Sequence, residues 1–359
     1  MPDASPDILA RGVVATVLSW VVIEVVLKQT NPVVYHHVRY NNIKLPPLLF
    51  LCRKYGVVET TRRCPYVPFG FTRPVVWTES LPTEERQKTD ALPADAIRYL
   101  TFSTPGGNRI GTSLFIDGCP NRMRRKERYL KGVLPTDDFL KPVFRAYHFR
   151  GEHAQYCHEY CLYNMAALTC RLHFGQQDEE DRVVQAVVHL AVGLTRVLNN
   201  PLDMTLPDPY DAKTTVRDAI EKVDREETTT IVGRWKRAGF SDEDIFVEFV
   251  HNVFGMTLQW SVLLFHTFQL KVSLPLKQDD VRAFIVRTRP SPVAASRSDD
   301  SSTLLLHPLG QTCGRYDNFG LGNRRCPGEE LTYAMLTTLH HTPFPMPSPP
   351  SFTLGLFKY

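Results

Sequence analysis

The stretch that decides the fold is Phe319-Gly-Leu-Gly-Asn-Arg-Arg-Cys-Pro-Gly328. It fits the pattern F-x-x-G-x-R-x-C-x-G at each fixed position: Phe319, Gly322, Arg324, Cys326 and Gly328. The glycines let the backbone come so close to the cysteine that N–H groups can turn towards a thiolate. The planar fork of an arginine suits a carboxylate. The pattern therefore indicates a loop built around one cysteine sulfur.

This decapeptide resembles the cysteine-ligand loop of the cytochromes P450, the haem-thiolate oxygenases. The resemblance implies that Cys326 is the axial ligand to the iron of a haem b and that Arg324 faces a haem propionate. It also implies that Phe319 packs beside the sulfur, while Gly322 and Gly328 let the loop close around it. A thiolate ligand favours O–O cleavage because it donates electron density to the iron. The alternative is a buried cysteine in a glycine-rich turn.

Two helices are predicted on either side of the haem that this resemblance implies. Residues 329–341 follow the loop and have Leu331, Met335 and Leu339 on one helical face. The positive end of that helix would help to hold the thiolate. The longest apolar-periodic stretch is 242–270, and Ser241 with Asp244 forms a capping signal at its start. We expect the haem between the 242–270 helix and the Cys326 loop.

The 242–270 helix is where the family usually bears an acid–alcohol pair after a small residue. This chain has Phe254-Gly-Met-Thr-Leu-Gln259, so Gly255 and Thr257 are the candidates for the oxygen side, and no carboxylate lies beside them in the sequence. His251-Asn252 is similar to the distal helix of the branch that rearranges fatty-acid hydroperoxides. An ordinary helix histidine is the alternative interpretation of His251.

The other family motifs match less well. Residues 117–126 resemble the proximal helix, and Arg124 and Arg125 are the candidates for propionate binding; a solvated basic face or a docking face for an acidic redox partner is the alternative. Phe284 stands where the Glu-x-x-Arg motif would have its glutamate, in Phe284-Ile-Val-Arg287. A full match at 59–62 is out of order for the family. The chain is therefore identified as a divergent or truncated member.

Elsewhere, periodicity and composition predict four further features. Helices are expected at 178–198, which ends before Asn199-Asn200-Pro201, and at 215–238, which ends at Gly239. The stretch 282–315 is rich in proline and serine, which predicts mostly coil, and the tail 343–350 should be irregular.

Composition limits the class of protein. The chain has 359 residues, 43% of them apolar, which is enough for a large core. A net charge of +4 is too small to suggest nucleic-acid binding. The 8 cysteines have no tight pairing pattern, so reduced thiols are expected. Cys157 and Cys161 with His153 and His158 resemble metal ligands but lack a second half-site.

The N-terminal segment has a short apolar stretch at 12–23, within a mostly apolar 8–27. We interpret residues 1–30 as a marginal membrane anchor on the cytoplasmic face of the endoplasmic reticulum, and 31–359 as the haem domain. A buried or interfacial helix is the alternative.

The resulting expectation is a mainly α fold with small β-sheets, a cytochrome P450-like haem-thiolate fold that is incomplete in places. The expected function is a monooxygenase that inserts one oxygen atom from O2 into a lipophilic small molecule, as in secondary metabolism, with electrons from an NADPH-dependent reductase. The alternatives are an isomerase or dehydratase of fatty-acid hydroperoxides and a degenerate, non-catalytic relative.

Overall fold

The structure, a computed structural model, describes 121–134, 136–151, 156–175, 180–199, 210–288, residue 319 and 326–346, together with the backbone of six short strands. Side chains of 121–125, 136–137 and 194–199 lie outside the description. The chain divides into two units, Met1–Val75 and Val76–Tyr359. The helices and their contacts described below all belong to the second unit.

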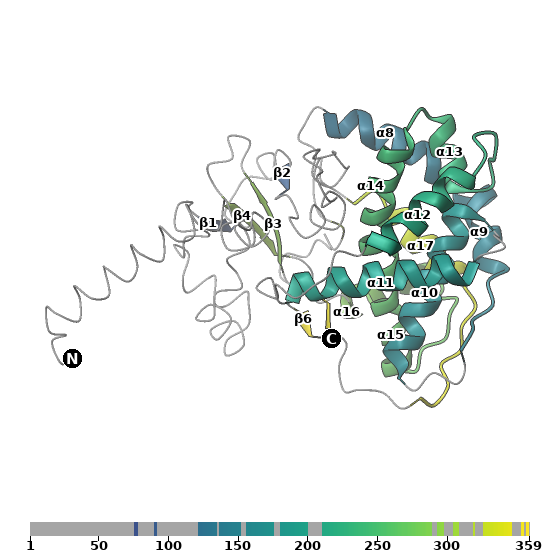
Figure 1. Ribbon diagram of the computed structural model, residues 1–359. Coiled ribbons are helices and arrows are strands. Elements are labelled where there is room, and N and C mark those ends of the chain that lie inside the picture. Colours follow the sequence, from purple (N-terminus) through teal and green to yellow (C-terminus); the bar gives the residue numbers. More distant parts are fainter. Residues whose placement is uncertain are drawn as a thin grey trace, which may run out of the picture. The chain divides into compact units, whose positions relative to one another are not determined.

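The described elements are mostly helical (Figure 1). The helices are α8 (Asn121–Val133), α9 (Thr136–Arg145), α10 (Cys157–Phe174), α11 (Glu180–Asn199), α12 (Tyr210–Lys222), α13 (Ile231–Arg237), α14 (Asp242–Asn252), the π-helix η5 (Val253–Leu258), α15 (Gln259–Leu270), α16 (Gln278–Thr288) and α17 (Glu329–Thr338). The strands are β1 (Val75–Trp77), β2 (Asp90–Ala91), β3 (Val293–Arg297), β4 (Leu304–Pro308), β5 (Thr353–Leu354) and β6 (Phe357–Lys358).

The strands form small sheets. One sheet has the order β1-β4-β3-β2, and β5 pairs with β6. In the first sheet β3 and β4 are antiparallel, with Val293 opposite Pro308 and Arg297 opposite Leu304. The predicted class, mainly α with small β-sheets, is confirmed.

Helix α10 is the centre of the helical core. Every residue from Asn164 to Phe174 is buried except Arg171, and the helix contacts α9, α11, α13, η5 and α15. A helix that is apolar around most of its circumference is buried on all sides, and this explains its central place. Helix α10 therefore supplies the surface against which η5 and the helices on either side of it pack.

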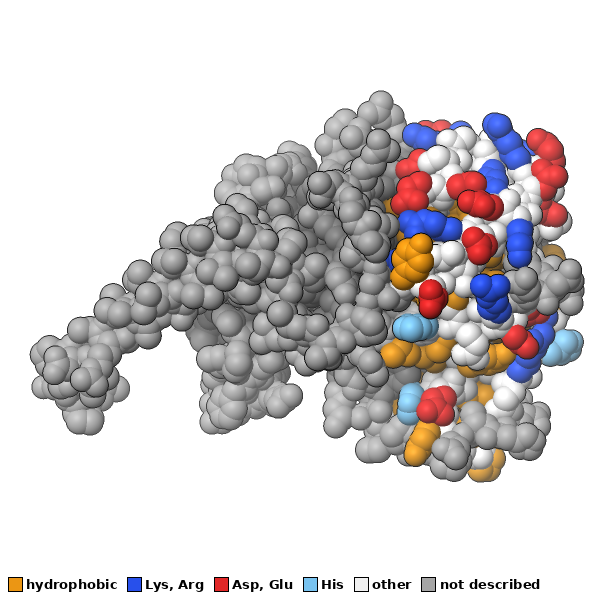
Figure 2. Space-filling model, in the orientation of Figure 1, with side chains coloured by type: hydrophobic (Ala, Val, Ile, Leu, Met, Phe, Trp, Pro, Cys, Tyr) orange, Lys and Arg blue, Asp and Glu red, His pale blue; other side chains and the backbone are white. Residues whose placement is uncertain are grey.

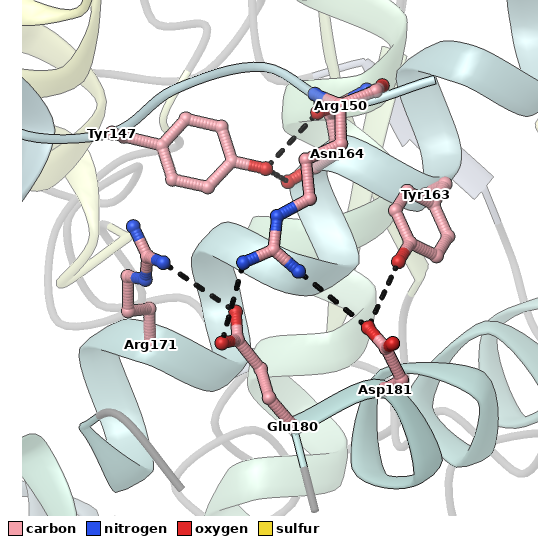
Figure 3. A network of polar contacts seen from close by, with 7 residues as sticks. All are labelled: Tyr147, Arg150, Tyr163, Asn164, Arg171, Glu180 and Asp181. Carbon is pink, nitrogen blue, oxygen red and sulfur yellow. Dashed lines mark hydrogen bonds and ion pairs between the residues drawn. The ribbon is translucent and has the colours of Figure 1, made fainter. Parts of the chain in front are cut away.

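A network of polar contacts joins α10 to the segment after α9 and to the start of α11 (Figure 3). The Arg150 guanidinium lies 3.5 Å from carboxylate oxygens of both Glu180 and Asp181, and Arg171 lies 3.7 Å from Glu180. On the inner side, the buried Tyr147 hydroxyl donates to the carbonyl oxygen of Asn164 at 2.9 Å. These contacts tie the segment after α9 and the start of α11 to α10.

The predicted helices at 178–198 and 242–270 are confirmed, the second with a π-helix in its middle. Ser241 is the N-cap of α14, and its hydroxyl accepts from the backbone N–H of Asp244. The helix expected at 329–341 ends at Thr338, because Leu339 is extended. Residues 343–346, the described part of the proline-rich tail, have no regular structure.

Two predictions are wrong. The helix expected at 215–238 is two helices, α12 and α13. Between them, Glu227 accepts hydrogen bonds from the backbone and hydroxyl of Thr229, and Thr230 caps α13 by accepting from the N–H of Gly233. Such local side-chain bonds compete with helical ones. The stretch 282–315, expected to be mostly coil, contains the end of α16 and the β3–β4 pair. Helix α16 packs on the core through Val281 and Ile285, which are buried and four residues apart.

On the face shown in Figure 2, the described surface of the helical part mixes charges of both signs. No helix among the described residues is long and apolar enough to cross a membrane. The proposed anchor at 1–30 and the Glu-x-x-Arg match at 59–62 lie outside the described residues.

Candidate functional site

The cysteine of the decapeptide lies at the N-terminus of α17. The backbone N–H of Cys326 donates to the carbonyl of Phe319 at 2.7 Å, and this bond closes the loop. Phe319 is only 8% exposed and contacts the ring of Tyr333. Gly328 is the N-cap of α17, and a Cβ there would lie 3.6 Å from the Cys326 sulfur. The first turn of α17 is therefore adjacent to the thiol, as predicted.

Cys326 is exposed, unlike the other described cysteines. Cys157, Cys161 and Cys170 are buried, and burial raises the pKa of the Cys161 and Cys170 thiols well above their usual value. A thiolate forms more readily at an accessible sulfur next to a helix N-terminus. The donor set thus fits a haem-thiolate ligand at Cys326.

The other predicted haem contacts are placed less fully. Gly322 and Arg324 lie outside the described residues. Arg124 and Arg125 belong to α8, and their side chains lie outside the description. Their roles towards a propionate stay predictions.

The two oxygen-side candidates lie in η5 and differ in surroundings. Thr257 is fully buried, and its hydroxyl donates to the Thr169 hydroxyl of α10 at 3.0 Å. Gly255 is partly exposed. Apart from its chain neighbours and the nearby backbone of its own helix, no atom of the described residues lies within 4 Å of a Cβ built there. Thr257 therefore faces α10, while Gly255 borders open space within the described part of the chain.

Asn252, the residue before η5, belongs to a buried hydrogen-bond chain whose proton positions can be worked out. His173 Nδ1 lies 2.7 Å from the carbonyl oxygen of Thr169, which can only accept, so Nδ1 carries the hydrogen. Burial lowers the pKa of His173 to about 4, so the ring is neutral near pH 7 and Nε2 is an acceptor. Asn252 Nδ2 donates to that Nε2 at 2.8 Å. Its Oδ1 then faces Tyr129, whose hydroxyl donates at 2.7 Å.

Tyr129 joins this chain to the neighbourhood of the cysteine. Burial raises the pKa of Tyr129 above its usual value, and negative charge at Cys326 and Glu248 raises it further. The Trp235 indole of α13 donates to the Tyr129 carbonyl at 3.0 Å. Tyr129 of α8 thus hydrogen-bonds to the 242–270 helix.

Sequence reasoning missed most of this chain. Tyr129, Thr169 and His173 belong to no motif, and Asn252 was noted for a different role. Glu248 is a fully buried carboxylate one helical turn before Asn252, and its Oε2 lies 3.7 Å from Nδ1 of His251. Glu248 lies seven residues before Gly255 and therefore outside the acid–alcohol position of the motif. The spacing could have indicated both polar residues, because Glu248 and Asn252 are four apart and so lie on one face of a helix whose neighbouring positions 245–247 and 249–250 are apolar.

The structure also describes position 284, at which the Glu-x-x-Arg motif would have its glutamate. Phe284 in α16 is 7% exposed and packs in the core with Val281 and Ile285. Arg287, three residues later, is exposed. An aromatic core residue therefore occupies the place at which the Glu-x-x-Arg motif would have its acid.

The same architecture is found in solved structures. A zebrafish cytochrome P450, in a structure with progesterone, is similar over 82% of this chain and 91% of its own, with a TM-score of 0.56 and 14% identity. P450BioI, in complex with acyl carrier protein ligated to hexadec-9Z-enoic acid, is similar over 80% and 90%, with a TM-score of 0.54 and 12% identity. The fold is that of the cytochromes P450.

A thermophilic cytochrome P450 from Sulfolobus tokodaii is also similar, over 79% of this chain and 89% of its own, with a TM-score of 0.53 and 10% identity. No protein-family profile matches the sequence, and no curated protein matches it. Identity this low shows a shared fold alone, and the same fold can carry different activities.

Proposed function

We propose that this chain binds haem b through the thiolate of Cys326 and is a monooxygenase that inserts one oxygen atom from O2 into a lipophilic small molecule. The observation that carries the proposal is the exposed Cys326 thiol at the N-terminus of α17, in a P450 fold. Bound haem would supply the oxygen activation, to which a thiolate ligand contributes electron density.

The residues of the chain have separate tasks in this proposal. Cys326 would hold the iron. Phe319, which is buried, would keep water from the sulfur. Arg324, Arg124 and Arg125 are the candidates for pairing with the propionates. Gly255 leaves room beside η5, and the partly buried Phe254 next to it offers an apolar surface to a substrate. Thr257 remains a candidate for proton delivery only through a change of its bond to Thr169.

Lipophilic substrates suit the apolar surroundings of η5, where Met256 and Leu258 are buried. Two of the similar structures have ligands that are also lipophilic: progesterone in one, and a fatty acid on acyl carrier protein in the other. Electrons would come from an NADPH-dependent reductase. Residues 1–30 would anchor the protein at the cytoplasmic face of the endoplasmic reticulum, and their deletion should release it from membranes with haem retained. A full-length protein that is already soluble in cells would contradict the anchor.

The hydroperoxide alternative depends on Asn252. In the structure its amide accepts from Tyr129 and donates to His173, and the residue is buried. These bonds turn the amide towards α8 and α10, which supports the monooxygenase over the isomerase or dehydratase. Turnover of a fatty-acid hydroperoxide without NADPH would favour the alternative.

The non-catalytic alternative is motivated by Phe284. A buried phenylalanine cannot form the Glu–Arg pair of the family, so stable haem incorporation has to be tested directly. Soluble, folded protein that takes up no haem would support this alternative.

The deciding experiment is the carbon monoxide difference spectrum of the reduced protein. We expect a thiolate-ligated Soret band in the wild type and its loss in Cys326→Ala. Cys170→Ala is the matched control, because it removes a buried thiol from α10 and should leave the band in place. A band that survives in Cys326→Ala would assign the ligand elsewhere.

A further inference from the structure

The ends of the π-helix η5 are both bound to one face of α10. Asn252, the residue before η5, donates to Nε2 of His173 at 2.8 Å. Thr257, near its end, donates to the Thr169 hydroxyl at 3.0 Å. His173 and Thr169 are themselves joined, because the ring Nδ1 lies 2.7 Å from the Thr169 carbonyl. All four side chains are buried.

The spacing of these residues differs on the two helices. His173 and Thr169 are four apart on a regular α-helix, so they lie on one face, one turn apart. Asn252 and Thr257 are five apart. At about 100° per residue, five residues of α-helix would leave them about 140° apart around the axis. In a π-helix the i→i+5 hydrogen bond brings such residues nearly into line. Both can reach the same face of α10 because η5 is a π-helix.

We infer that His173 and Thr169 are positioning residues that fix where the extra residue of the 242–270 helix is accommodated. Helices α14 and α15 are buried on both sides of η5, so packing retains the extra residue within the helix. Packing alone leaves its location open, and the two hydrogen bonds restrict it to the segment between Asn252 and Thr257. Gly255 lies inside that segment and borders the open space.

The consequence for chemistry rests on the proposed function. If haem lies next to the 242–270 helix, the two hydrogen bonds determine which residue of that helix faces the oxygen side of the haem. In this chain that residue is Gly255, which has no side chain. These hydrogen bonds join residues of the chain to one another, so their formation does not require bound haem. The positioning role and the proposed function can therefore fail separately.

The test is amide hydrogen exchange of 253–258 in the full-length protein as isolated, compared between two substitutions at one position. Thr169→Val removes the acceptor for Thr257 and keeps the shape, whereas Thr169→Ser keeps the hydroxyl and removes a methyl group. Loss of one buried hydrogen bond should speed exchange in 253–258 about tenfold in Thr169→Val, and Thr169→Ser should stay within about twofold of wild type.

His173→Phe provides an independent variant. It keeps an aromatic ring against Phe249 and Trp235 but removes both nitrogens, so exchange in 253–258 should again rise about tenfold. Tyr147→Phe is the control, because it deletes a buried hydroxyl bonded to α10 at Asn164, away from η5. It should leave exchange in 253–258 unchanged.

Equal exchange in 253–258 for Thr169→Val, Thr169→Ser and Tyr147→Phe would overturn the positioning role, whatever the haem content. A carbon monoxide spectrum recorded on the same samples reports on haem independently. Faster exchange in Thr169→Val and His173→Phe without any haem signal would support the positioning role and contradict the proposed function.

Discussion

Nδ2 of Asn252 lies 2.8 Å from Nε2 of His173, and this bond joins α14 to α10 inside the core. His173 is fully buried and also contacts the rings of Phe249 and Trp235. Each ring nitrogen has one role, because the Thr169 carbonyl requires a donor and the Asn252 amide presents one. A second proton on His173 would place two donors against each other at Nε2.

Acid should destabilise the protein partly through this histidine. Burial lowers the pKa of His173 to about 4 from its usual 6.5, and that of His341 likewise to about 4. Between these pH values the unfolded chain binds a proton that the folded one does not, so stability is complete above about pH 6.5 and falls as pH drops towards 4. The contribution of His173 is about 3 kcal/mol.

Urea unfolding measured from pH 4 to 7 would test this. His173→Phe should reduce the slope of the free energy of unfolding against pH by up to about 1.4 kcal/mol per pH unit. His341→Phe should remove a similar share, and the double variant both. An unchanged slope in His173→Phe would contradict the assignment of a neutral buried ring.

Gly255→Ala should make the fold more stable. Glycine within a helix costs about 0.5–1 kcal/mol relative to alanine, and the described residues leave space for the added methyl group. Gly132→Ala is the comparison, because a Cβ at Gly132 would collide with the Trp235 indole. That variant should lose about 1–3 kcal/mol in chemical denaturation. Destabilisation by Gly255→Ala would mean that the space beside η5 is filled.

Glu180 should contribute more to stability than its neighbour Asp181. The Glu180 side chain is 13% exposed and pairs with both Arg150 and Arg171, whereas that of Asp181 is 80% exposed (Figure 3). We expect a loss of about 1 kcal/mol for Glu180→Gln and less than about 0.5 kcal/mol for Asp181→Asn. Denaturation at low and high salt would measure both, and the Glu180 effect should shrink in high salt. Equal losses would show that the partial burial of Glu180 has no influence.

Restoring the family's glutamate at position 284 should fail. Phe284→Glu would place a carboxylate where a buried ring now packs, at a cost of about 3 kcal/mol or more. Phe284→Leu, which keeps the site apolar, should cost less than about 1.5 kcal/mol. Thermal unfolding of the two variants decides the matter. If Phe284→Glu were as stable as Phe284→Leu, an acidic residue would be compatible with α16, and the phenylalanine would need another explanation.

Much of the fold could be predicted because long helices leave a clear periodic pattern. The stretches 178–198 and 242–270 are apolar at helical spacing, and Ser241 caps the second. The helix after Cys326 followed from the same pattern. Composition was a poorer guide at 282–315. The proline and serine content of this stretch predicted coil, although Val281 and Ile285 around its start have helical spacing and are buried.

The candidate site was predicted at its cysteine and missed in its interior. Five letters at fixed spacing identified Cys326, whereas the contacts of Asn252 join residues up to 123 positions apart. A π-helix inserts one extra residue into a helix without needing a helix-breaking residue such as proline. The sequence pattern at 242–270 therefore did not indicate the π-helix. Which polar residues of that helix meet α10 depends on how the two helices pack.

Helix length at 242–270 can change at one place more easily than at others. Deleting a residue from α14 or α15 would turn everything beyond it by about 100° and expose apolar side chains that are now buried. Deleting one between Asn252 and Thr257 would leave these two residues four apart, on one face of an ordinary α-helix. Relatives of this chain should therefore differ in length by one residue inside this short segment, while their helices on either side keep the same number of residues.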